Sequence, residues 1–328
     1  MTLLLSLVAF VASAAGVRAF LGISRRRFLD LPGARSSHSV PTPTGGGFPA
    51  VAVFLIVSSV AVALNAVPAG PRFWACLLCG GALSLVGLLD DVLDLPSSAR
   101  FLVHALVAGA VVCWLGHPGP VDGPASSLAA TISVGVVAGL INAFNFMDGI
   151  DALVGSTGVL IVFCLGVFSG DPIWFILAAS YSGFLVFNLP PARIFMGDAG
   201  STVLGGLVGV ALLSGGAELE IRHTLILAPL IGDSAYTILR RTMRRENILR
   251  AHHSHLYQRL LRAGHSHGAI SAGYALSTLV IALLVAFYGN TGAAIGAVGC
   301  AVAVVAIEQH VSRRGVPFTR PQRDSSSA

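Results

Sequence analysis

The sequence predicts an all-α protein: a polytopic membrane bundle of about eleven transmembrane helices. Of its 328 residues, 55% are hydrophobic and only 11% are charged, whereas soluble domains carry about 25% charged residues. Apolar segments close to the roughly 20 residues that a helix needs to cross a bilayer recur along the whole chain. We expect one integral membrane domain over residues 1–310 and a basic, disordered cytoplasmic tail over residues 311–328.

The apolar segments follow one another with short connections. The first, residues 3–22, has no basic residues before it, and a run of three arginines begins at Arg25 just after it. This arrangement predicts an uncleaved first helix whose N-terminus lies outside the cell. The later expected spans are residues 46–67, 73–89, 101–116, 126–144, 153–169, 173–188, 200–214, 222–239, 270–288 and 292–308.

The arginines support this arrangement of spans. All 20 basic residues are arginines, and with the N-terminus outside, all but Arg18, Arg72 and Arg222 fall on the inner side. A missed span would scatter them over both sides, so their distribution favours the count of spans. The absence of lysine excludes a Walker-type phosphate loop and Schiff-base chemistry.

The polar motifs fall on the predicted cytoplasmic face, and the first of them is "GLLDDVLD". Asp90 and Asp91 stand at the inner end of the third span. Adjacent carboxylates in a partly dehydrated site repel each other, so they need a proton, a cation or a metal ion. Arg100 could balance their charge. The alternative is a solvated pair of acids in a loop.

The second motif, "NAFNFMDGID", has a polar residue at every third position. On a continuous helix this spacing keeps Asn142, Asn145, Asp148 and Asp151 near one face. Their oxygen atoms suit Mg²⁺ or the hydroxyl groups of a sugar. The alternative is a helix cap at the membrane interface.

The third motif, "RIFMGDAGST", places Asp198 just before a helix that we expect to begin near Ser201. Gly197 and Gly200 would let the backbone come close to a ligand. A carboxylate at this place favours a cation, most simply Mg²⁺ that holds phosphate groups. The alternative is an N-cap, a position that aspartate prefers.

A basic inner loop, "HHSHLYQRL", follows the ninth span. Its side chains could surround a diphosphate, and the candidates are His252, His253, His255 and Arg259. A zinc site that includes His265 and His267 is one alternative, and a surface for anionic lipid headgroups is another. Asp233, inside the ninth span, could be a functional carboxylate or a hydrogen-bonded structural acid.

These groups together indicate phosphoryl transfer between a water-soluble nucleotide and a membrane lipid. Such a reaction needs a positioned nucleophile, a metal ion to gather charge and cations on the diphosphate. An ion- or proton-coupled transporter is the main alternative, but its carboxylates would lie near the bilayer midplane. The second alternative is a non-catalytic lipid-binding subunit, but such a subunit would not need both the double aspartate and "FMGDAGS".

The motifs "DD", "NAFNFMDGIDAL", "FNLPPARIFMGDAGS" and the histidine-rich loop occur in the order seen in a known family. With them, the chain resembles the polyprenyl-phosphate N-acetylhexosamine-1-phosphate transferases, also called glycosyltransferase family 4-like. The resemblance implies a transferase in the bacterial inner membrane. It also implies that the enzyme requires Mg²⁺, for which Mn²⁺ can substitute. It implies that undecaprenyl phosphate attacks the β-phosphate of a UDP-N-acetylamino sugar and releases UMP. A homodimer is a further expectation, and no nucleic acid partner is expected.

The resemblance also implies roles for individual residues. It makes Asp198 the main Mg²⁺ ligand with Asn145 close by, and it makes Asp90 or Asp91 the group that deprotonates or orients the lipid phosphate. Asp148 and Asp151 match acids near the diphosphate and sugar, and direct attack by the lipid phosphate is favoured over a covalent aspartyl intermediate. The residues that it assigns to substrate binding are Asn142, Asn188, Phe195, His252, His253, His255 and Arg259, with Asn188 and Phe195 holding the uracil.

Two departures from the family pattern narrow the expectation. The loop "HHSHLYQ" replaces the "HHHFE"-like loop of the peptidoglycan branch, which favours enzymes that initiate O-antigen. Their donors carry N-acetylglucosamine or a 6-deoxy sugar such as N-acetylfucosamine or N-acetylquinovosamine, and the motifs do not choose among these. The lysines that the family has near the double aspartate are missing, so Arg100 is the expected substitute.

Overall fold

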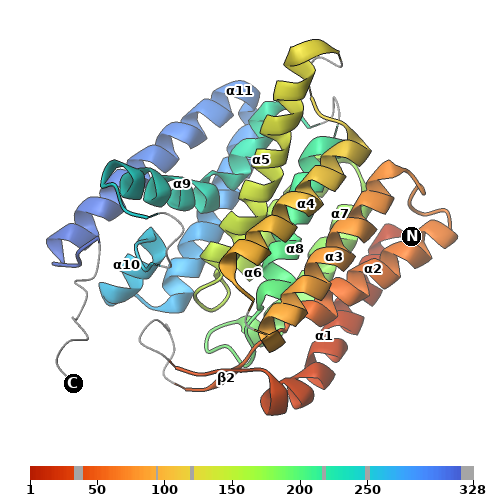
Figure 1. The fold of residues 1–328 in the computed structure, drawn as a ribbon, viewed down its shortest axis with the longest axis horizontal. Coiled ribbons are helices and arrows are strands. Elements are labelled where there is room, and N and C mark those ends of the chain that lie inside the picture. The colour runs from red at the N-terminus through yellow and green to blue at the C-terminus, as the bar shows by residue number, and fades with distance from the viewer. Residues whose placement is uncertain (33–39, 94, 119–121, 216–218, 248–251, 319–328) are drawn as a thin grey trace.

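The computed structural model describes residues 1–32, 40–93, 95–118, 122–215, 219–247 and 252–318. These residues form a helical bundle, and the prediction of an all-α architecture is confirmed. In Figure 1 the N-terminal helices lie on one side of the bundle, and the C-terminal helices lie on the other. The predicted boundary between one membrane domain and a tail at residue 310 stays a prediction.

The first eight predicted spans each correspond to one helix. They are α1 Thr2–Arg27, α2 Gly47–Ala63, α3 Pro71–Leu93, α4 Ser97–Leu115, α5 Gly123–Met147, α6 Leu153–Ser169, α7 Pro172–Asn188 and α8 Asp198–Ser214. A short antiparallel ribbon, β1 Leu29–Asp30 with β2 Thr42–Pro43, precedes α2. Leu29 pairs with Pro43 in this ribbon.

The C-terminal part differs from the sequence prediction in two ways. The ninth span is a 3₁₀-helix, η1 Ile221–Leu227, that continues into the amphipathic helix α9 Ala228–Met243. A short helix that the sequence did not predict, α10 Leu256–Arg262, follows the histidines. It escapes prediction because its seven residues are too few to show a helical pattern of apolar positions.

The last two predicted spans are the two halves of one assigned helix, α11 His267–Arg313. The helix reverses direction at Gly289, whose φ of 55° and ψ of −127° lie outside the helical region. A Cβ atom placed on Gly292 would lie 1.8 Å from the carbonyl oxygen of Leu284. Near this turn the two halves therefore pack directly against each other as a helical hairpin, and the predicted break between residues 288 and 292 is confirmed.

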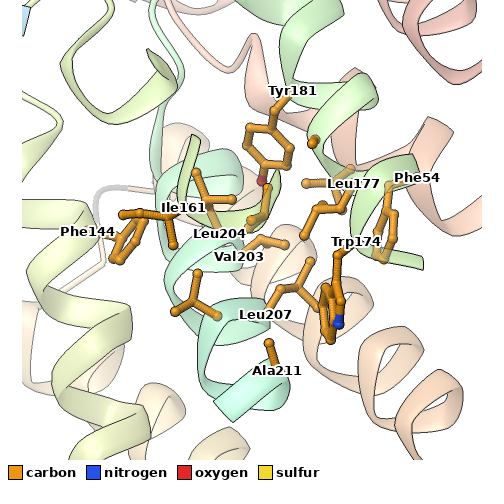
Figure 2. Close-up of a cluster of buried hydrophobic side chains, with 14 of the residues drawn as sticks. Phe54, Phe144, Ile161, Trp174, Leu177, Tyr181, Val203, Leu204, Leu207 and Ala211 are labelled. Atoms are coloured by element: carbon orange, nitrogen blue, oxygen red, sulfur yellow. The ribbon is translucent and has the colours of Figure 1, made fainter. Parts of the chain in front are cut away.

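Helix α8 forms the centre of the core. It is apolar on all sides, which is typical of a helix enclosed by other helices. Figure 2 shows Val203, Leu204 and Leu207 of α8 among side chains of its neighbours, such as Phe144 of α5 and Trp174 of α7. Small residues allow this close packing, as in other membrane bundles. A Cβ atom on Gly205 would lie 2.5 Å from the carbonyl oxygen of Leu140.

The chain is a multi-pass membrane protein. Five of the described helices are long and apolar enough to cross a bilayer: α1, α3, α4, α5 and α11. The shorter apolar helices α2, α6, α7 and α8 pack among them. Their 17 residues correspond to about 25 Å of helix, slightly less than the hydrocarbon thickness of a bilayer.

An ion pair clamps the end of the bundle that lies away from the polar motifs. Arg72, at the start of α3, pairs with Asp171, the N-cap of α7. The Arg72 guanidinium also donates to the hydroxyl of Ser214 (2.9 Å) and to its carbonyl oxygen (2.6 Å) at the end of α8. The clamp fixes how far α3 and α8 can slide past each other, and their opposite ends carry Asp90 and Asp198.

Candidate active site

The polar motifs meet at one end of the bundle, where α3 ends, α5 ends and α8 begins. Helices α3 and α8 touch there: a Cβ atom on Gly87 would lie 2.2 Å from the backbone nitrogen of Ala199. Gly87 stands about one helical turn before Asp90, and Ala199 follows Asp198. The glycine thus lets the two acids, more than a hundred residues apart in the chain, face each other.

A single cationic group joins the two carboxylates. Nη1 of Arg100 donates to Oδ2 of Asp90 (3.0 Å) and to Oδ2 of Asp198 (3.1 Å). Nδ2 of Asn145 donates to Oδ1 of Asp198 (2.7 Å), and the backbone amide of Leu95 donates to Oδ1 of Asp90 (2.9 Å). We call these four side chains, Asp90, Arg100, Asn145 and Asp198, the acidic cluster. The expectation that Arg100 balances the double aspartate is confirmed for Asp90.

Asp198 does not cap its helix. Helix α8 begins at Asp198 itself, with Gly197 as the N-cap, and its first turn has no side-chain cap. The expected helix start near Ser201 is therefore wrong by one turn, and so is the alternative of an N-cap. The side chain is directed to Arg100 and Asn145 instead, as a ligand-binding carboxylate would be. The side chain of Asp91 lies outside the described residues.

The four polar residues of "NAFNFMDGID" do not share one helix, so that expectation is wrong. Helix α5 ends at Met147, and the chain then turns through Asp148 to Asp151. Beside this turn, the hydroxyl of Tyr257 lies 2.1 Å from where a Cβ atom on Gly149 would be, so a residue larger than glycine does not fit there. Tyr257 also donates to the carbonyl oxygen of Phe146 (3.1 Å).

Asn142 and Asn145 remain on α5, and a histidine supports them from α4. Nδ1 of His104 lies 3.2 Å from Oδ1 of Asn142, and Nδ2 of Asn142 donates to the carbonyl oxygen of Ala138 (2.7 Å). His104 is 5% exposed. Sequence reasoning did not select it, because a single histidine in an apolar span carries no motif; only its polarity could have pointed to it.

Asp151 fixes the turn after α5 to two other segments. Its carboxylate lies 3.2 Å from Nδ1 of His267 and accepts from the amide of Ala192 (3.0 Å). The hydroxyl of Ser271 donates to its carbonyl oxygen (2.7 Å). Burial alone would raise the pKa of Asp151, but these hydrogen bonds hold it below its ordinary value. Asp151 is thus an ionised anchor of the turn.

Asp148 has the opposite electrostatics, since burial and the nearby charge of Asp198 raise its pKa to about 8. The carboxyl of Asp148 therefore binds its proton more tightly in the folded protein than in the unfolded chain, where its pKa is near 3.8. The stability that Asp148 contributes is complete below about pH 4 and is lost as the pH rises through the folded pKa.

We expect Asp148→Asn to remove this pH dependence. In metal-free buffer, the Tm of the natural protein should fall relative to that of Asp148→Asn as the pH rises from about 5 to about 9. Thermal unfolding of both proteins across this range measures the difference. If the Tm values of the two proteins changed with pH in parallel, the raised pKa of Asp148 would be contradicted.

The residues expected at the uracil lie beside the turn. Nδ2 of Asn188 donates to the carbonyl oxygen of Ile194, and its Oδ1 accepts from the amide of Ala152, both at 3.0 Å. Asn188 is 3% exposed, and its two hydrogen bonds connect the turn after α5 to the segment before α8. Phe195 is half-buried, and its amide donates to the carbonyl oxygen of Pro43 in β2 (2.8 Å). Their roles in holding uracil stay predictions.

The histidine loop is attached to the bundle by Asp233. This carboxylate is 1% exposed and accepts from the amides of Leu256 (2.8 Å) and Tyr257 (3.0 Å) at the start of α10. It also accepts from the hydroxyl of Tyr274 (2.6 Å) and lies 3.3 Å from Nδ1 of His255. Of the two readings of Asp233, the structure favours a structural acid.

Within this loop the remaining candidates differ in exposure. His252 and His253 are half-buried, and burial together with the charges around it lowers the pKa of His252 to about 3, so His252 is neutral at physiological pH. Arg259 is 1% exposed, and its guanidinium pairs with Glu308 and donates to the carbonyl oxygen of Val316 (3.1 Å). Contact of Arg259 with a diphosphate stays a prediction, since its charge is already paired here.

We expect Asp233→Ala to destabilise the loop strongly. The change leaves the amides of Leu256 and Tyr257 and the hydroxyl of Tyr274 buried without an acceptor, at about 1–3 kcal/mol for each group. Hydrogen exchange of the α10 amides should rise far more than exchange in α8. Thr237→Val, which removes only a long 3.2 Å contact to Asp233, is the matched control. Unchanged α10 protection in Asp233→Ala would exclude this role.

The acidic cluster suits Mg²⁺ better than zinc. Among the described residues, no group of three or more His, Cys, Asp or Glu side chains has metal-binding geometry, so the zinc alternative finds no site there. Mg²⁺ is commonly held by one or two carboxylates together with the phosphates of a substrate. The carboxylates of Asp90 and Asp198 already converge on one cationic nitrogen, so their oxygens fit such a site.

Known proteins resemble this chain in sequence. Residues 73–216, which include the acidic cluster, match the model of glycosyl transferase family 4. An undecaprenyl-phosphate alpha-N-acetylglucosaminyl 1-phosphate transferase of Yersinia pestis is 30% identical, with 81% of this chain and 79% of the relative covered. A decaprenyl-phosphate N-acetylglucosaminephosphotransferase of Mycolicibacterium smegmatis is 28% identical over 72% of this chain and 69% of the relative. A Thermotoga maritima protein named like that of Yersinia is 32% identical over 57% of both chains.

Proposed function

We propose a specific reaction for this chain. It belongs to glycosyl transferase family 4, among the polyprenyl-phosphate N-acetylhexosamine-1-phosphate transferases, and it is therefore a membrane phosphoglycosyl transferase. The protein transfers N-acetylglucosamine 1-phosphate from UDP-N-acetylglucosamine to undecaprenyl phosphate, in a bacterial inner membrane. The relatives described above are all named for N-acetylglucosamine phosphate transfer to a polyprenyl phosphate, which supports this donor over the 6-deoxy sugars.

The observation that carries the proposal is the acidic cluster. Asp90 and Asp198 come from different helices and share one cationic nitrogen at 3.0 and 3.1 Å. They stand at the ends of membrane helices, where a lipid phosphate and a soluble nucleotide can meet. An ion- or proton-coupled transporter would need such carboxylates near the bilayer midplane, so the position of the cluster opposes this alternative.

In the proposed reaction, an oxygen of the lipid phosphate attacks the β-phosphorus of the donor. The bond from this phosphorus to the oxygen that bridges it to the α-phosphate breaks, and UMP leaves with that oxygen. The products are undecaprenyl-diphosphate-N-acetylglucosamine and UMP. A phosphate monoester is already a nucleophile once it is positioned, so no covalent enzyme intermediate is required.

Each group of the cluster has a task in this reaction. Mg²⁺, with Mn²⁺ as a substitute, would neutralise charge on the diphosphate when bound. Asp198 and Asn145 would hold this ion, and Asp90 or Asp91 would orient the lipid phosphate and accept its proton. Arg100 balances the charge of the two carboxylates, and its guanidinium would suit a substrate phosphate when a bound ion neutralises them.

The product would be a lipid-linked sugar on the cytoplasmic face, on which a surface glycan such as O-antigen is assembled. The test uses purified protein, undecaprenyl phosphate, Mg²⁺ and a panel of UDP-N-acetylamino sugars, with the lipid product identified by mass spectrometry. We expect the diphosphate-linked sugar with UDP-N-acetylglucosamine and little product from its 4-epimer or the 6-deoxy donors. Product formation from a 6-deoxy donor alone would refute the donor assignment while keeping the reaction type.

A further inference from the structure

A cavity of about 600 Å³ lies between α9, α10 and the two halves of α11. Its size falls within the range of small-molecule sites, about 300–1,000 Å³. All its lining residues belong to the segment from Pro229 to Ile307. Helices α3, α4, α5 and α8, which carry the acidic cluster, contribute none of them. The cavity is therefore a separate feature from the candidate active site.

The walls of the cavity are mostly apolar and reach the outer surface of the bundle. Besides His265, its polar lining residues are Tyr274, Ser277 and Asp233, whose carboxylate accepts hydrogen bonds from Leu256, Tyr257 and Tyr274. Leu276, Val280 and Ile295 line it and are still 61%, 45% and 52% exposed. Since α11 is a membrane helix, this exposed face meets the hydrocarbon of the bilayer. Gly273 and Gly299 widen the cavity, because a Cβ atom on either would meet no atom within 4 Å. Water finds few polar partners on such walls, so a hydrocarbon chain is the occupant that they favour.

One end of the cavity is polar and basic. His265 lines it there, and Nε2 of His265 lies 3.0 Å from Nε2 of His310. His310 follows the lining residue Ile307 by about one helical turn, and the exposed Arg314 follows His310 by another. Two imidazoles at the end of an apolar cavity, with a cationic residue one helical turn further along α11, complement a phosphate group that carries a hydrocarbon chain.

We propose that this cavity binds one anionic phospholipid of the bilayer. Its hydrocarbon chain lies between the halves of α11, and its phosphate meets His265, His310 and Arg314. The acceptor lipid is a poorer candidate, because the lining shares no residue with the acidic cluster where its phosphate must react. Leu256 and Leu260 of α10 line the same cavity, so a lipid there also supports the helix that follows the histidine loop.

The natural cysteine Cys300 lines the cavity and can report its occupancy. In a Cys113→Ser background, Cys300 is the only remaining cysteine that is not buried. We expect phosphatidylglycerol to slow its alkylation by N-ethylmaleimide about tenfold when the lipid is present at ten times its Kd. Phosphatidylcholine at equal concentration should slow it much less. This experiment changes no residue of the cavity, so misfolding cannot explain its outcome.

A second experiment blocks the cavity. Gly299→Phe places a ring in the cavity without a backbone clash, and Gly109→Phe on α4, which is equally open at Cβ, is the matched control outside it. By native mass spectrometry, Gly299→Phe should retain one phosphatidylglycerol fewer than the natural protein and than Gly109→Phe. His310→Gln combined with Arg314→Gln should abolish the preference for phosphatidylglycerol over phosphatidylcholine in the labelling assay.

Three results would overturn the proposal. The first is equal protection of Cys300 by both phospholipids, which would show that the cavity does not select an anionic headgroup. The second is unchanged lipid retention in Gly299→Phe. The third is displacement of phosphatidylglycerol by an equimolar amount of undecaprenyl phosphate, which would make the cavity part of the acceptor site. Each readout is independent of turnover, so failure here leaves the proposed reaction to its own test.

Discussion

Asp198→Asn should lower turnover by about 10³-fold or more, because in the proposed reaction this carboxylate holds the Mg²⁺ that neutralises the charge of the diphosphate. The asparagine keeps the shape of the side chain and can still meet Asn145, while Arg100 keeps its 3.0 Å contact with Asp90. The fold should therefore survive, with a Tm close to that of the natural protein. Initial rates with purified protein and unchanged elution in size-exclusion chromatography measure the two effects.

The matched control is Asp122→Asn. Asp122 is the N-cap residue of α5, at the opposite end of that helix from Asn145 and the acidic cluster. The same chemical change there should leave the rate unchanged. Turnover of Asp198→Asn within a factor of ten of the natural protein would show that this carboxylate is not a principal ligand of the reacting phosphates.

Gly87→Ala should also cause a large loss, although it changes no polar group. The new methyl group would lie 2.2 Å from the backbone nitrogen of Ala199, so α3 and α8 must separate where Asp90 faces Asp198. Displacement of reacting groups by about 1 Å can cost a hundredfold in rate. The strain should also lower stability by about 1–3 kcal/mol. Rates and thermal unfolding of the variant measure both effects.

Gly81→Ala is the control for this change. It lies on the same helix, and a Cβ atom there meets no atom within 4 Å. We expect natural activity and equal or slightly higher stability, because alanine favours the helix more than glycine does. If Gly87→Ala and Gly81→Ala behaved alike, the close contact of α3 with α8 would not be what brings the two acids together.

The gathering of the polar motifs at one end of the bundle could be predicted from sequence because its signals are local. Apolar length, arginine distribution and polar motifs placed Asp90, Asn145 and Asp198 at the same predicted face. In the structure, Arg100 joins Asp90 to Asp198, and Asn145 donates to Asp198. The alternation of predicted spans places these residues at one end of the bundle, whereas their contact depends on the close approach of α3 and α8 at Gly87.

Other features depend on tertiary contacts that the sequence pattern does not record. The packing of Tyr257 against Gly149, just after the end of α5 at Met147, joins residues that are distant in the chain. The contact of His104 with Asn142 joins two helices through a histidine that belongs to no motif. The pairing of Arg259 with Glu308 likewise depends on the hairpin of α11, so the spacing of the histidine loop could not reveal it.

The most direct test of the central claim follows the β-phosphorus of the donor. The purified protein is given UDP-N-acetylglucosamine labelled with ³²P at the β-phosphate, together with undecaprenyl phosphate and Mg²⁺. Transfer of the sugar 1-phosphate predicts that the label moves to the lipid and that unlabelled UMP appears in equal amount. Label that stays in released UDP, with sugar alone on the lipid, would contradict the account.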